Sequence, residues 1–441
     1  MAYTGVFVKN PLRKAAQDKK KITAIRRSFA TVRGRQVDNA WRIPDLEDRK
    51  SRLRMVREYS IGNKELMEVA IDNLKANGIE VSLAQTRDEA ISFVLEQIGD
   101  DKVIVKAKSN VTKEIELAKE LEHRGLDTIE TDIGDRVIQI MKESPSHYTG
   151  PASHLSKESI AGALSAHFEK GLSPDPLALT KVIRDEVAEK IASANIGIIG
   201  ANAIAAEEGA IVLLHNEGNA TQVAMRPGKL IIMTGIDKVY PNLEEAINLA
   251  KLQTFYATGV IITSFINIIS GPSKTADIEK QLVKGVHGPQ SVHLILLDNG
   301  RSKIAQGDFR ELLYCIGCGE CLLECPAYYV YGNKFAVGHQ LGGRGVVYSC
   351  MTQGQMQHLP TRELYSCVTC GRCKKKCPVG IDTPGLISEL RRQYATLLRE
   401  PHLQDAYRFT ESHLKLVFSG ARLEVLAVMA AALALDEDDK Q

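Results

Sequence analysis

The sequence predicts an α/β domain with a mostly parallel sheet, followed by a smaller helical domain that holds all the cysteines. Short apolar runs alternate with segments of helical periodicity between about residues 51 and 300, and all nine cysteines lie between residues 315 and 377. A chain of 441 residues is long enough for two or three domains. We therefore expect four segments: a basic N-terminal arm (1–50), the α/β domain (51–300), the helical domain (301–395) and a C-terminal docking tail (396–441).

The elements of the α/β domain are predicted from apolar spacing and from turn residues. Helical periodicity begins at Leu53 and stops at Asn77-Gly78. Thr86 and Glu89 form a capping-box pattern that opens a helix ending near residue 99. Further helices are expected at residues 111–124, 177–194 and 243–250. Apolar runs bounded by turn residues predict strands at residues 79–83, 103–105, 128–131, 196–199, 210–214, 230–233, 260–263 and 292–297.

Residues 9–35 carry ten lysines and arginines against one acidic residue, Asp18. Such a basic arm can contact nucleic acid, an acidic membrane or an acidic protein. We expect it instead to be a solvated, partly disordered lead-in that binds no nucleic acid. If it binds a partner, an acidic neighbouring subunit is the favoured one.

The N-terminus shows no apolar stretch followed by a small-residue cleavage site, as a secretory signal would. The longest apolar runs, 259–269 and 423–435, are shorter than the ~20 residues that a membrane span needs. Because the cysteines are confined to one region, no disulfide could link the first 314 residues together. We expect a cytoplasmic protein without a transmembrane segment, which could still lie beside a membrane through a partner.

The helical domain contains two copies of one cysteine motif, C-x2-C-x2-C-x3-C-P. The eight cysteines are Cys315, Cys318, Cys321 and Cys325 in the first copy and Cys367, Cys370, Cys373 and Cys377 in the second. Bacterial ferredoxins hold iron–sulfur clusters with this spacing, and their fourth cysteine ligates the other cluster. Structural zinc is the alternative, but its cysteines usually come as two separated C-x2-C pairs. The sequence therefore predicts two [4Fe–4S] clusters: Cys315, Cys318, Cys321 and Cys377 hold one, and Cys367, Cys370, Cys373 and Cys325 hold the other.

The surroundings of the two motifs are predicted in less detail. Helix-favouring residues flank them, at 309–314 and at 386–398, and residues 332–354 are expected to form a loop around part of the cluster site. Cys350 is the odd cysteine and is expected to pack as a small apolar residue, with service as an alternative ligand left open. Lysines at 374–376 should raise the potential of the neighbouring cluster, unless they only form an exposed helix face.

Several expected signatures of organic redox chemistry are absent from the sequence. No G-x-G-x-x-G follows a predicted strand, and neither a Walker A motif nor H-E-x-x-H occurs. Oxidising an organic substrate by hydride transfer needs a two-electron cofactor such as flavin or nicotinamide. The chain is therefore expected to relay electrons for a partner that performs the organic chemistry.

Several segments of the α/β region resemble the LUD (lactate utilisation) domain. They are Val105-Lys-Ala-Lys-Ser-Asn110, Thr131-Asp-Ile-Gly134, Glu143-Ser-Pro-Ser-His147, Gly200-Ala-Asn202, Asn216-Glu-Gly-Asn219, Gly271-Pro-Ser-Lys-Thr-Ala-Asp277, Gly285-Val-His-Gly-Pro289 and Leu297-Asp-Asn-Gly-Arg301. Followed by two cysteine motifs, their order is similar to that of the lactate-utilisation iron–sulfur protein family (LutB/LldF). The resemblance covers roughly residues 50–395.

The resemblance implies an α/β fold related to the NagB/RpiA sugar-phosphate isomerases and to CoA transferases. It also implies an electron-transfer subunit of a complex that oxidises L-lactate or a similar 2-hydroxy acid to the 2-oxo acid. The expected partners are a cysteine-rich iron–sulfur subunit and a second LUD protein or a flavoprotein dehydrogenase. This chain would then be a non-catalytic part of a lactate dehydrogenase-type oxidoreductase.

A second group of candidate residues lies where open α/β sheets tend to bind ligands, at strand ends. Glu217 follows a predicted strand and could be a carboxylate nucleophile by analogy with CoA transferases, although an exposed turn is the simpler interpretation. Lys106, Lys108, Ser109 and Asn110 could bind an anion, or the lysines could be solvated strand-end charges. The alternative function is accordingly a ligand-binding protein or an acyl- or CoA-transfer-like enzyme, with structural or sensory clusters.

Overall fold

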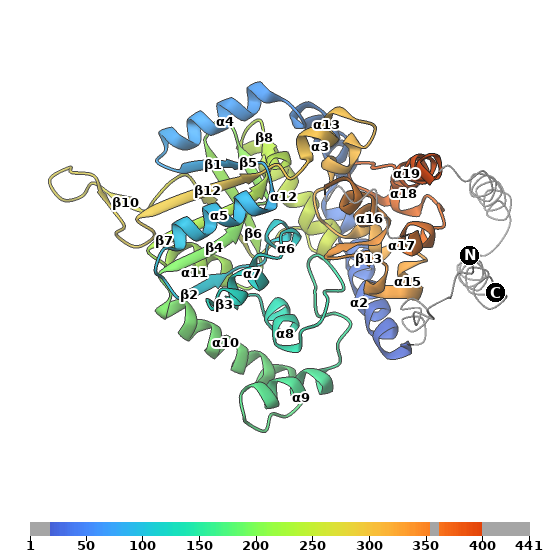
Figure 1. Cartoon of the computed structure of the whole chain (residues 1–441), viewed down its shortest axis with the longest axis horizontal. Coiled ribbons are helices and arrows are strands. Elements are labelled where there is room, and N and C mark those ends of the chain that lie inside the picture. Colours follow the sequence, from blue (N-terminus) through green and yellow to red (C-terminus); the bar gives the residue numbers. More distant parts are fainter. Residues whose placement is uncertain (1–17, 353–360, 399–441) are drawn as a thin grey trace, which may run out of the picture.

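The computed structural model describes residues 18–352 and 361–398 of the chain (Figure 1). Its centre is a six-stranded sheet in the order β1-β12-β7-β4-β2-β3, in which every neighbouring pair is parallel. The strands are β1 (Glu80–Ala84), β2 (Val103–Lys106), β3 (Asp127–Glu130), β4 (Ile196–Gly200), β7 (Lys229–Gly235) and β12 (Ser291–Leu297). The predicted α/β domain with a mostly parallel sheet is confirmed.

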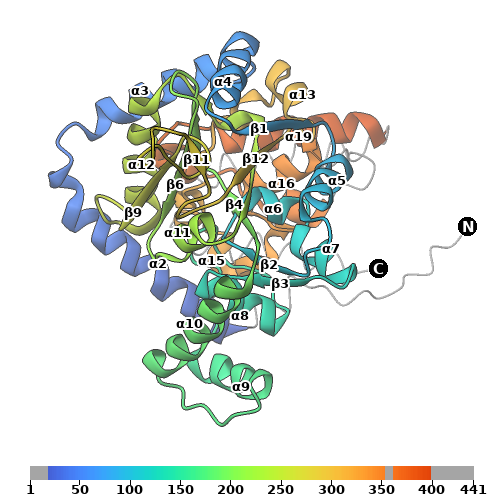
Figure 2. The same cartoon turned by 90° about the vertical axis from the view of Figure 1, so that its left-hand side faces the viewer.

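Helices cover both faces of this sheet, which explains why its strands are almost continuously apolar. In β7, Leu230 and Ile232 pack on one face while Ile231 and Met233 pack on the other. One face is covered by α4 (Lys64–Ala76), α8 (Ile133–Met141), α9 (Lys157–His167), α10 (Pro176–Ser193) and α11 (Asn219–Met225). The other is covered by α5 (Arg87–Ile98), α6 (Asn110–Glu114) and α7 (Leu117–His123). Figure 2 shows α9 and α10 at the edge of the molecule.

A second, four-stranded sheet joins the α/β region to the cysteine-rich region. Its order is β8-β5-β6-β9, with β5 and β6 antiparallel. The strands are β5 (Ala203–Ala205), β6 (Ala210–His215), β8 (Val239–Tyr240), preceded by the 3-10 turn η2 (Ile236–Lys238), and β9 (Phe265–Ile269). Its covering helices α3 (Leu46–Ser60) and α12 (Leu243–Thr258) belong to the same apolar core as the cysteine motifs.

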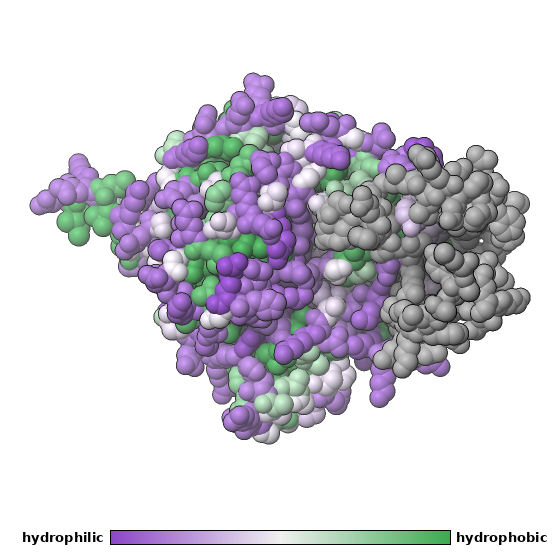
Figure 3. Space-filling view, in the orientation of Figure 1, coloured by the Kyte–Doolittle hydropathy of each residue, from purple (hydrophilic) through white to green (hydrophobic). Residues whose placement is uncertain are grey.

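A hairpin of β10 (Lys274–Thr275) and β11 (Val283–Lys284) projects from the α/β region, away from the cysteine-rich region (Figure 1). Ile278 and Leu282, in its tip, are 73% and 62% exposed. Figure 3 shows the tip as a mixture of hydrophobic and hydrophilic residues on an otherwise largely hydrophilic face.

The cysteine-rich region is mainly helical, as predicted. It contains α13 (Arg301–Gln306), η3 (Arg310–Tyr314), α14 (Glu320–Leu323), α15 (Tyr328–Tyr331), η4 (Gly332–Lys334), a hairpin of β13 (Ala336–Val337) and β14 (Gln340–Leu341), α16 (Gly342–Thr352), α17 (Thr361–Ser366), α18 (Arg372–Lys376) and α19 (Thr383–Leu398). The loop predicted for residues 332–354 is therefore wrong over its described part. Most of it is hairpin and helix, because Val346, Val347 and Cys350 bury one side of α16 in the core.

The expectation of a disordered basic lead-in is wrong for residues 19–35, which belong to helix α2 (Lys19–Asn39). The helix runs beside the cysteine-rich region (Figure 1) and continues into the 3-10 turn η1 (Ala40–Arg42). Between its lysines and arginines the segment has three apolar residues at helical spacing, Ile22, Ile25 and Phe29, and all three are buried. Burial of this face against the core, rather than charge, determines how the segment folds.

Three predicted elements are divided or displaced. The long helix after Leu53 is two helices, α3 and α4, separated at Gly62, whose φ is +74°. The helix at 111–124 is also two, because Glu116 adopts a left-handed conformation between α6 and α7. Residues 260–263 form no strand. The nearest strand, β9, begins at Phe265 and pairs with β6. The predicted C-terminal docking tail lies outside the described residues, except for the end of α19.

Across the described ranges, no helix combines the length and the apolar character that crossing a bilayer requires.

Candidate functional site

The first three cysteines of the first motif lie beside the last cysteine of the second motif. Burial raises the pKa of Cys318 well above its ordinary value, and the nearby charges of Cys377 and Cys315 add to the effect. Burial likewise raises the pKa of Cys321, with further contributions from Cys315, Cys318 and Cys377. These electrostatic effects associate Cys315, Cys318, Cys321 and Cys377, which we call the first group, although Cys373 of the second motif also acts on Cys321.

The remaining four motif cysteines, which come from both motifs, are called the second group. Burial raises the pKa of Cys325 to about 12, with Cys367 and then Cys370 as the neighbouring charges. Burial also raises the pKa of Cys373, with contributions from Cys367, Cys325 and Cys370. The two groups adjoin, because Cys373 also acts on Cys321 of the first group.

The backbone around the motifs is suited to bulky, electron-rich sulfur. Gly317, Gly319 and Gly371 have φ values of +74°, +80° and +78°, which side chains disfavour. These conformations turn backbone N–H groups toward sulfur: the N–H of Gly317 donates to Cys315 Sγ at 3.3 Å. Further N–H groups donate to the thiols of Cys318, Cys325, Cys367, Cys373 and Cys377. Grouped thiols with N–H donors and an apolar surround are a donor set that fits iron–sulfur clusters.

Cys350 belongs to neither group. It is 1% exposed within α16, and burial raises its pKa to about 11. Its contacts are with the apolar core, which matches the expectation of a packed apolar residue.

The first motif is enclosed by helix α2 and by the α/β region. Gln36 donates from Nε2 to Glu320 Oε2 at 2.7 Å and to the carbonyl oxygen of Tyr256 at 3.1 Å. Arg33 pairs with Glu324 at 3.0 Å. His147, buried and with its pKa lowered to about 4 by burial, packs directly on Gly319. Arg26, which donates to the carbonyl oxygen of Tyr329, and Arg33 thus bind carbonyl and carboxylate groups of the same chain.

The second motif is more open. Helix α18 contains no buried residue, and Lys374, Lys375 and Lys376 are exposed. Lys374 pairs with Asp382 at 2.6 Å. These lysines therefore form an exposed helix face, which was the alternative interpretation from the sequence.

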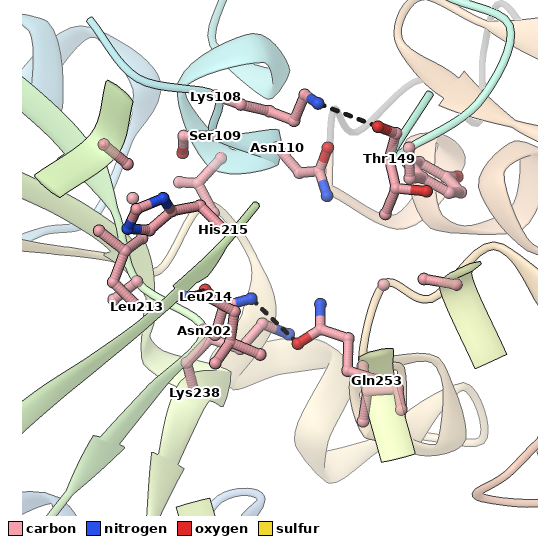
Figure 4. A pocket seen from close by; sticks show the side chains of 18 of the residues that line it. Lys108, Ser109, Asn110, Thr149, Asn202, Leu213, Leu214, His215, Lys238 and Gln253 are labelled. Atoms are coloured by element: carbon pink, nitrogen blue, oxygen red, sulfur yellow. Dashed lines mark hydrogen bonds between the residues drawn. The ribbon is translucent and has the colours of Figure 1, made fainter. Parts of the chain in front are cut away.

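A cavity of about 290 Å³ lies between the α/β region and the first motif. Figure 4 shows ten of its lining residues by name, and all of them come from the α/β region and the second sheet with its helix α12. Cys315, Ile316 and Gly317 form part of its wall, opposite Lys108 and Glu217. Lys238 connects the regions, donating from Nζ to the carbonyl oxygen of Cys315 at 3.1 Å.

Lys108 is the cation of the cavity predicted from the sequence. Its Nζ lies 2.7 Å from Asp132 Oδ2 and donates to the carbonyl oxygen of Thr149 at 3.0 Å. Burial lowers the pKa of Lys108, but Asp132 and the neighbouring Asp135 outweigh burial and raise it overall. Lys108 therefore remains charged at neutral pH.

Glu217 shares the cavity with Asp132. Burial and then the charge of Asp132 raise the pKa of Glu217 to about 7, although its Oε2 accepts the backbone N–H of Ile133 at 3.1 Å. The carboxyl group can therefore hold or release a proton near neutral pH. The exposed turn predicted after β6 is present, and its carboxyl faces this cavity.

Two other predicted residues have different placements from those expected. Lys106 is 1% exposed, pairs with Glu130 at 2.9 Å and does not line the cavity, so its assignment as an anion ligand is wrong. The reason is β3, which places Glu130 directly beside β2. Ser109 lines the cavity, but its hydroxyl caps α6 by accepting the N–H of Thr112.

Sequence reasoning missed three residues that face the first motif. Gln253 and Lys238 lie on elements whose other positions are mainly apolar or turn-forming, so their pattern indicated nothing. Arg344 lies within the segment predicted as a loop, and its guanidinium is close to Cys315. Its role could have been predicted only if the helix α16 had been recognised, because that helix turns Arg344 toward the first motif.

Comparisons with known proteins agree with this geometry. Residues 67–297 match the family model described as LUD domain, and residues 311–381 match a 4Fe-4S dicluster domain. "Lactate utilization protein B" of Lysinibacillus sphaericus is 33% identical over 377 residues, which are 84% of this chain and 76% of that protein. The protein of that name from Geobacillus thermodenitrificans is 34% identical over 78% of this chain and 71% of its own length.

A third relative has a less specific name. The "Uncharacterized electron transport protein YkgF" of Escherichia coli is 31% identical over 83% of this chain and 77% of that protein. Together with the dicluster match, the eight motif cysteines bear out the prediction of two [4Fe–4S] clusters as the cofactors.

Proposed function

The chain belongs to the LUD domain family and is a relative of lactate utilization protein B, and on this premise we propose its finer function. It is the iron–sulfur electron-transfer subunit of an oxidoreductase complex. The complex oxidises L-lactate, or a similar 2-hydroxy acid, to the 2-oxo acid through a partner subunit. The relatives' names support lactate as the substrate, and the dicluster domain supports electron transfer.

One observation supports the proposal: cysteines of the two motifs act on one another's pKa, so the two motifs lie next to each other in the fold. We assign one cluster to Cys315, Cys318, Cys321 and Cys377. The other belongs to Cys367, Cys370, Cys373 and Cys325. In each cluster the fourth ligand comes from the other motif, as in two-cluster ferredoxins.

The protein supplies placement and electrostatics. Bound iron–sulfur clusters accept and release single electrons. Backbone N–H groups stabilise negative charge on the thiolates, and the apolar core excludes water from them. The guanidinium of Arg344 lies near Cys315, where its positive charge favours a more negative, reduced state.

The partner must supply two-electron chemistry, because flavin or nicotinamide performs hydride transfer. We propose a cysteine-rich iron–sulfur subunit and a second LUD protein or a flavoprotein dehydrogenase. The exposed lysines of α18 make the second motif the side that meets an acidic partner. Free cysteines throughout the described ranges are compatible with the reducing cytosol that we propose as the location.

Metal analysis of paired cysteine variants tests the crossed assignment. The anaerobically purified chain should contain about eight iron and eight sulfide. Replacing Cys315 and Cys377 together by serine should leave about four iron, because both are assigned to one cluster, whereas replacing Cys367 and Cys377 together should remove nearly all iron. Cys350→Ser is the matched control and should keep about eight. Zinc in place of iron, or the reverse result for the two paired variants, would contradict the assignment.

A second candidate function is favoured by one observation, the raised pKa of Glu217 in the cavity. In that case the chain is an acyl- or CoA-transfer-like enzyme, with Glu217 as nucleophile and the clusters structural or sensory. Glu217→Gln separates the two functions. Electron transfer to the partner should continue in this variant, and loss of turnover with intact cluster spectra would favour the second candidate.

A further inference from the structure

The cavity beside the first motif contains more hydrogen-bond donors than its own walls satisfy. Within the described part of the chain, neither the side-chain amide of Asn110, which is exposed, nor the Nε2 group of Gln253, which is half-buried, has a hydrogen-bond partner in the protein. Gln253 uses only its Oε1, which accepts from Asn202 Nδ2 at 2.9 Å. Figure 4 shows both amides pointing into the open space between the regions.

Lys108 adds a further donor on the same side. An ammonium group has three N–H bonds. Two of those of Lys108 are directed at Asp132 and Thr149, which leaves one for a ligand. A ligand that accepts from this ammonium and from the N–H groups of the two amides needs several acceptor atoms, and a carboxylate is the simplest group that supplies them.

The carboxyl of Glu217 can serve an additional polar group. It is able to hold a proton near neutrality, so it can donate to a carbonyl oxygen or accept from a hydroxyl. A 2-oxo acid and a 2-hydroxy acid each carry one of these groups next to the carboxylate. The cavity volume of about 290 Å³, set against roughly 30 Å³ for each water, leaves room for either acid with accompanying water.

The two amides also lie beside the loop that holds the first cysteine. A methyl group built on Gly317 would lie 3.6 Å from Asn110 Nδ2 and 3.8 Å from Gln253 Nε2. The N–H of Gly317 in turn donates to Cys315 Sγ at 3.3 Å. A ligand bound to these amides would therefore change the dipoles and the water around Cys315.

We propose that this cavity binds a small monocarboxylate and that its occupancy alters the cluster held by Cys315. The ligand carboxylate contacts Lys108 and the amides of Asn110 and Gln253, and its neighbouring oxygen contacts Glu217. The choice of 2-hydroxy and 2-oxo acids rests on the proposed function, whereas the site itself rests on the geometry. The cavity thus links the LUD domain to the redox state of the first motif.

The test uses the anaerobic full-length protein with both clusters. Equilibrium dialysis with labelled pyruvate and labelled L-lactate measures binding, with inorganic phosphate as competitor at matched ionic strength. Electron paramagnetic resonance of the dithionite-reduced protein, recorded with and without pyruvate, reports the clusters. Pyruvate should bind saturably, resist competition by phosphate and change the signal of one cluster only.

Asn110→Asp is the decisive variant, because it keeps the size of a side chain that has no partner and places a negative charge against the carboxylate. Its affinity for pyruvate should fall at least about tenfold, and the spectral change should disappear at the same ligand concentration. Gln306→Ala is the control, since Gln306 is an exposed amide remote from the cavity wall. Its affinity and spectra should match those of the unaltered protein.

Several results would overturn the proposal: no saturable binding of either acid, equal displacement by phosphate, or unchanged affinity in Asn110→Asp. Binding without any spectral change would overturn its second half. A protein that keeps about eight iron and reduces its partner, yet binds neither acid, would overturn this inference and leave the proposed function standing. A protein that binds pyruvate but lacks iron would overturn the proposed function and leave the carboxylate site standing.

Discussion

The two cysteine motifs have the same spacing but opposite surroundings. The first is enclosed, with α2 on one side and the cavity and His147 on another. The second ends in α18, a helix without buried residues that carries three adjacent exposed lysines. Identical motifs can therefore serve different roles, because a cluster's potential depends on hydrogen bonds, charge and solvent exposure rather than on cysteine spacing alone.

This difference indicates that the two motifs face different kinds of partner. The first motif meets the α/β region, where a small molecule can reach its loop. The second presents positive charge to solvent, where a protein can dock. Each of the following predictions tests whether the two motifs really differ in this way.

The largest difference should come from one pair of matched glycine substitutions. Gly319 and Gly371 occupy the same motif position, with φ of +80° and +78°. Alanine at Gly371 meets nothing within 4 Å, whereas at Gly319 its methyl group would lie 2.2 Å from His147 Nε2. We expect Gly371→Ala to lower the free energy of unfolding by about 1 kcal/mol from backbone strain, and Gly319→Ala by about 3 kcal/mol.

Anaerobic chemical denaturation followed by cluster absorbance would measure both effects. The double variant Gly319→Ala with His147→Ala serves as a control, because removing the imidazole should return the loss toward that of Gly371→Ala. Equal losses for the two single variants would show that both motifs are equally enclosed.

A smaller effect is expected at the basic helix of the second motif. Replacing Lys374, Lys375 and Lys376 by glutamine should slow association with an acidic redox partner about tenfold at low ionic strength. The difference should shrink as salt is added, since exposed charges are screened. Stopped-flow electron transfer at several salt concentrations measures this.

The matched control changes the same number of lysines elsewhere. Lys157, Lys170 and Lys181 are exposed on or beside α9 and α10, away from both motifs (Figure 2). Their replacement by glutamine gives the same net charge and should leave the association rate unchanged. An equal slowing in both triple variants would mean that net charge, and not the second motif, governs docking.

The smallest predicted effect concerns pH and the cavity. Burial and Asp132 raise the pKa of Glu217 to about 7, above its ordinary value of 4.5. The folded state therefore holds this proton more tightly than the unfolded state, so stability falls as pH rises from 4.5 toward 7 and remains lower above it. Because the side chain is exposed to the cavity, solvent screening limits the loss to about 1 kcal/mol.

Glu217→Gln removes this titration. The variant should be about 1 kcal/mol more stable than the unaltered protein at pH 8 and equal to it at pH 5. Thermal unfolding under anaerobic conditions at the two pH values compares them. A constant difference at both pH values would mean that Glu217 does not titrate in this range.

Much of the α/β domain could be predicted because its signals are local. Strands buried on both faces, such as β7 and β12, read as continuous apolar runs between turn residues. The Thr86 cap also appears as expected, accepting the N–H of Glu89. The helix α2 was missed because three apolar positions among many lysines and arginines are a weak signal, and their burial depends on a surface formed by other segments.

We propose residue 300 as the boundary between the α/β domain and the helical domain.

The candidate site divides in the same way. Cysteine spacing is a local property, so the sequence alone determined the two cofactors, whereas the assignment of their ligands remains a proposal. Lys106 and Lys108 looked equivalent in the sequence, yet β3 pairs Lys106 with Glu130 and leaves Lys108 in the cavity. No pattern in the chain could place Gln253 against Gly317, because 64 residues separate them.

By itself, the sequence determined an α/β domain, two iron–sulfur motifs and the chemistry of their thiols, since each follows from residues close together in the chain. Only the tertiary structure decided which motif is enclosed, which lysine lines the cavity and what faces Cys315. The physical reason is that burial and charge at a site depend on every segment packed around it. Those segments are brought together by one shared apolar core and not by their order in the chain.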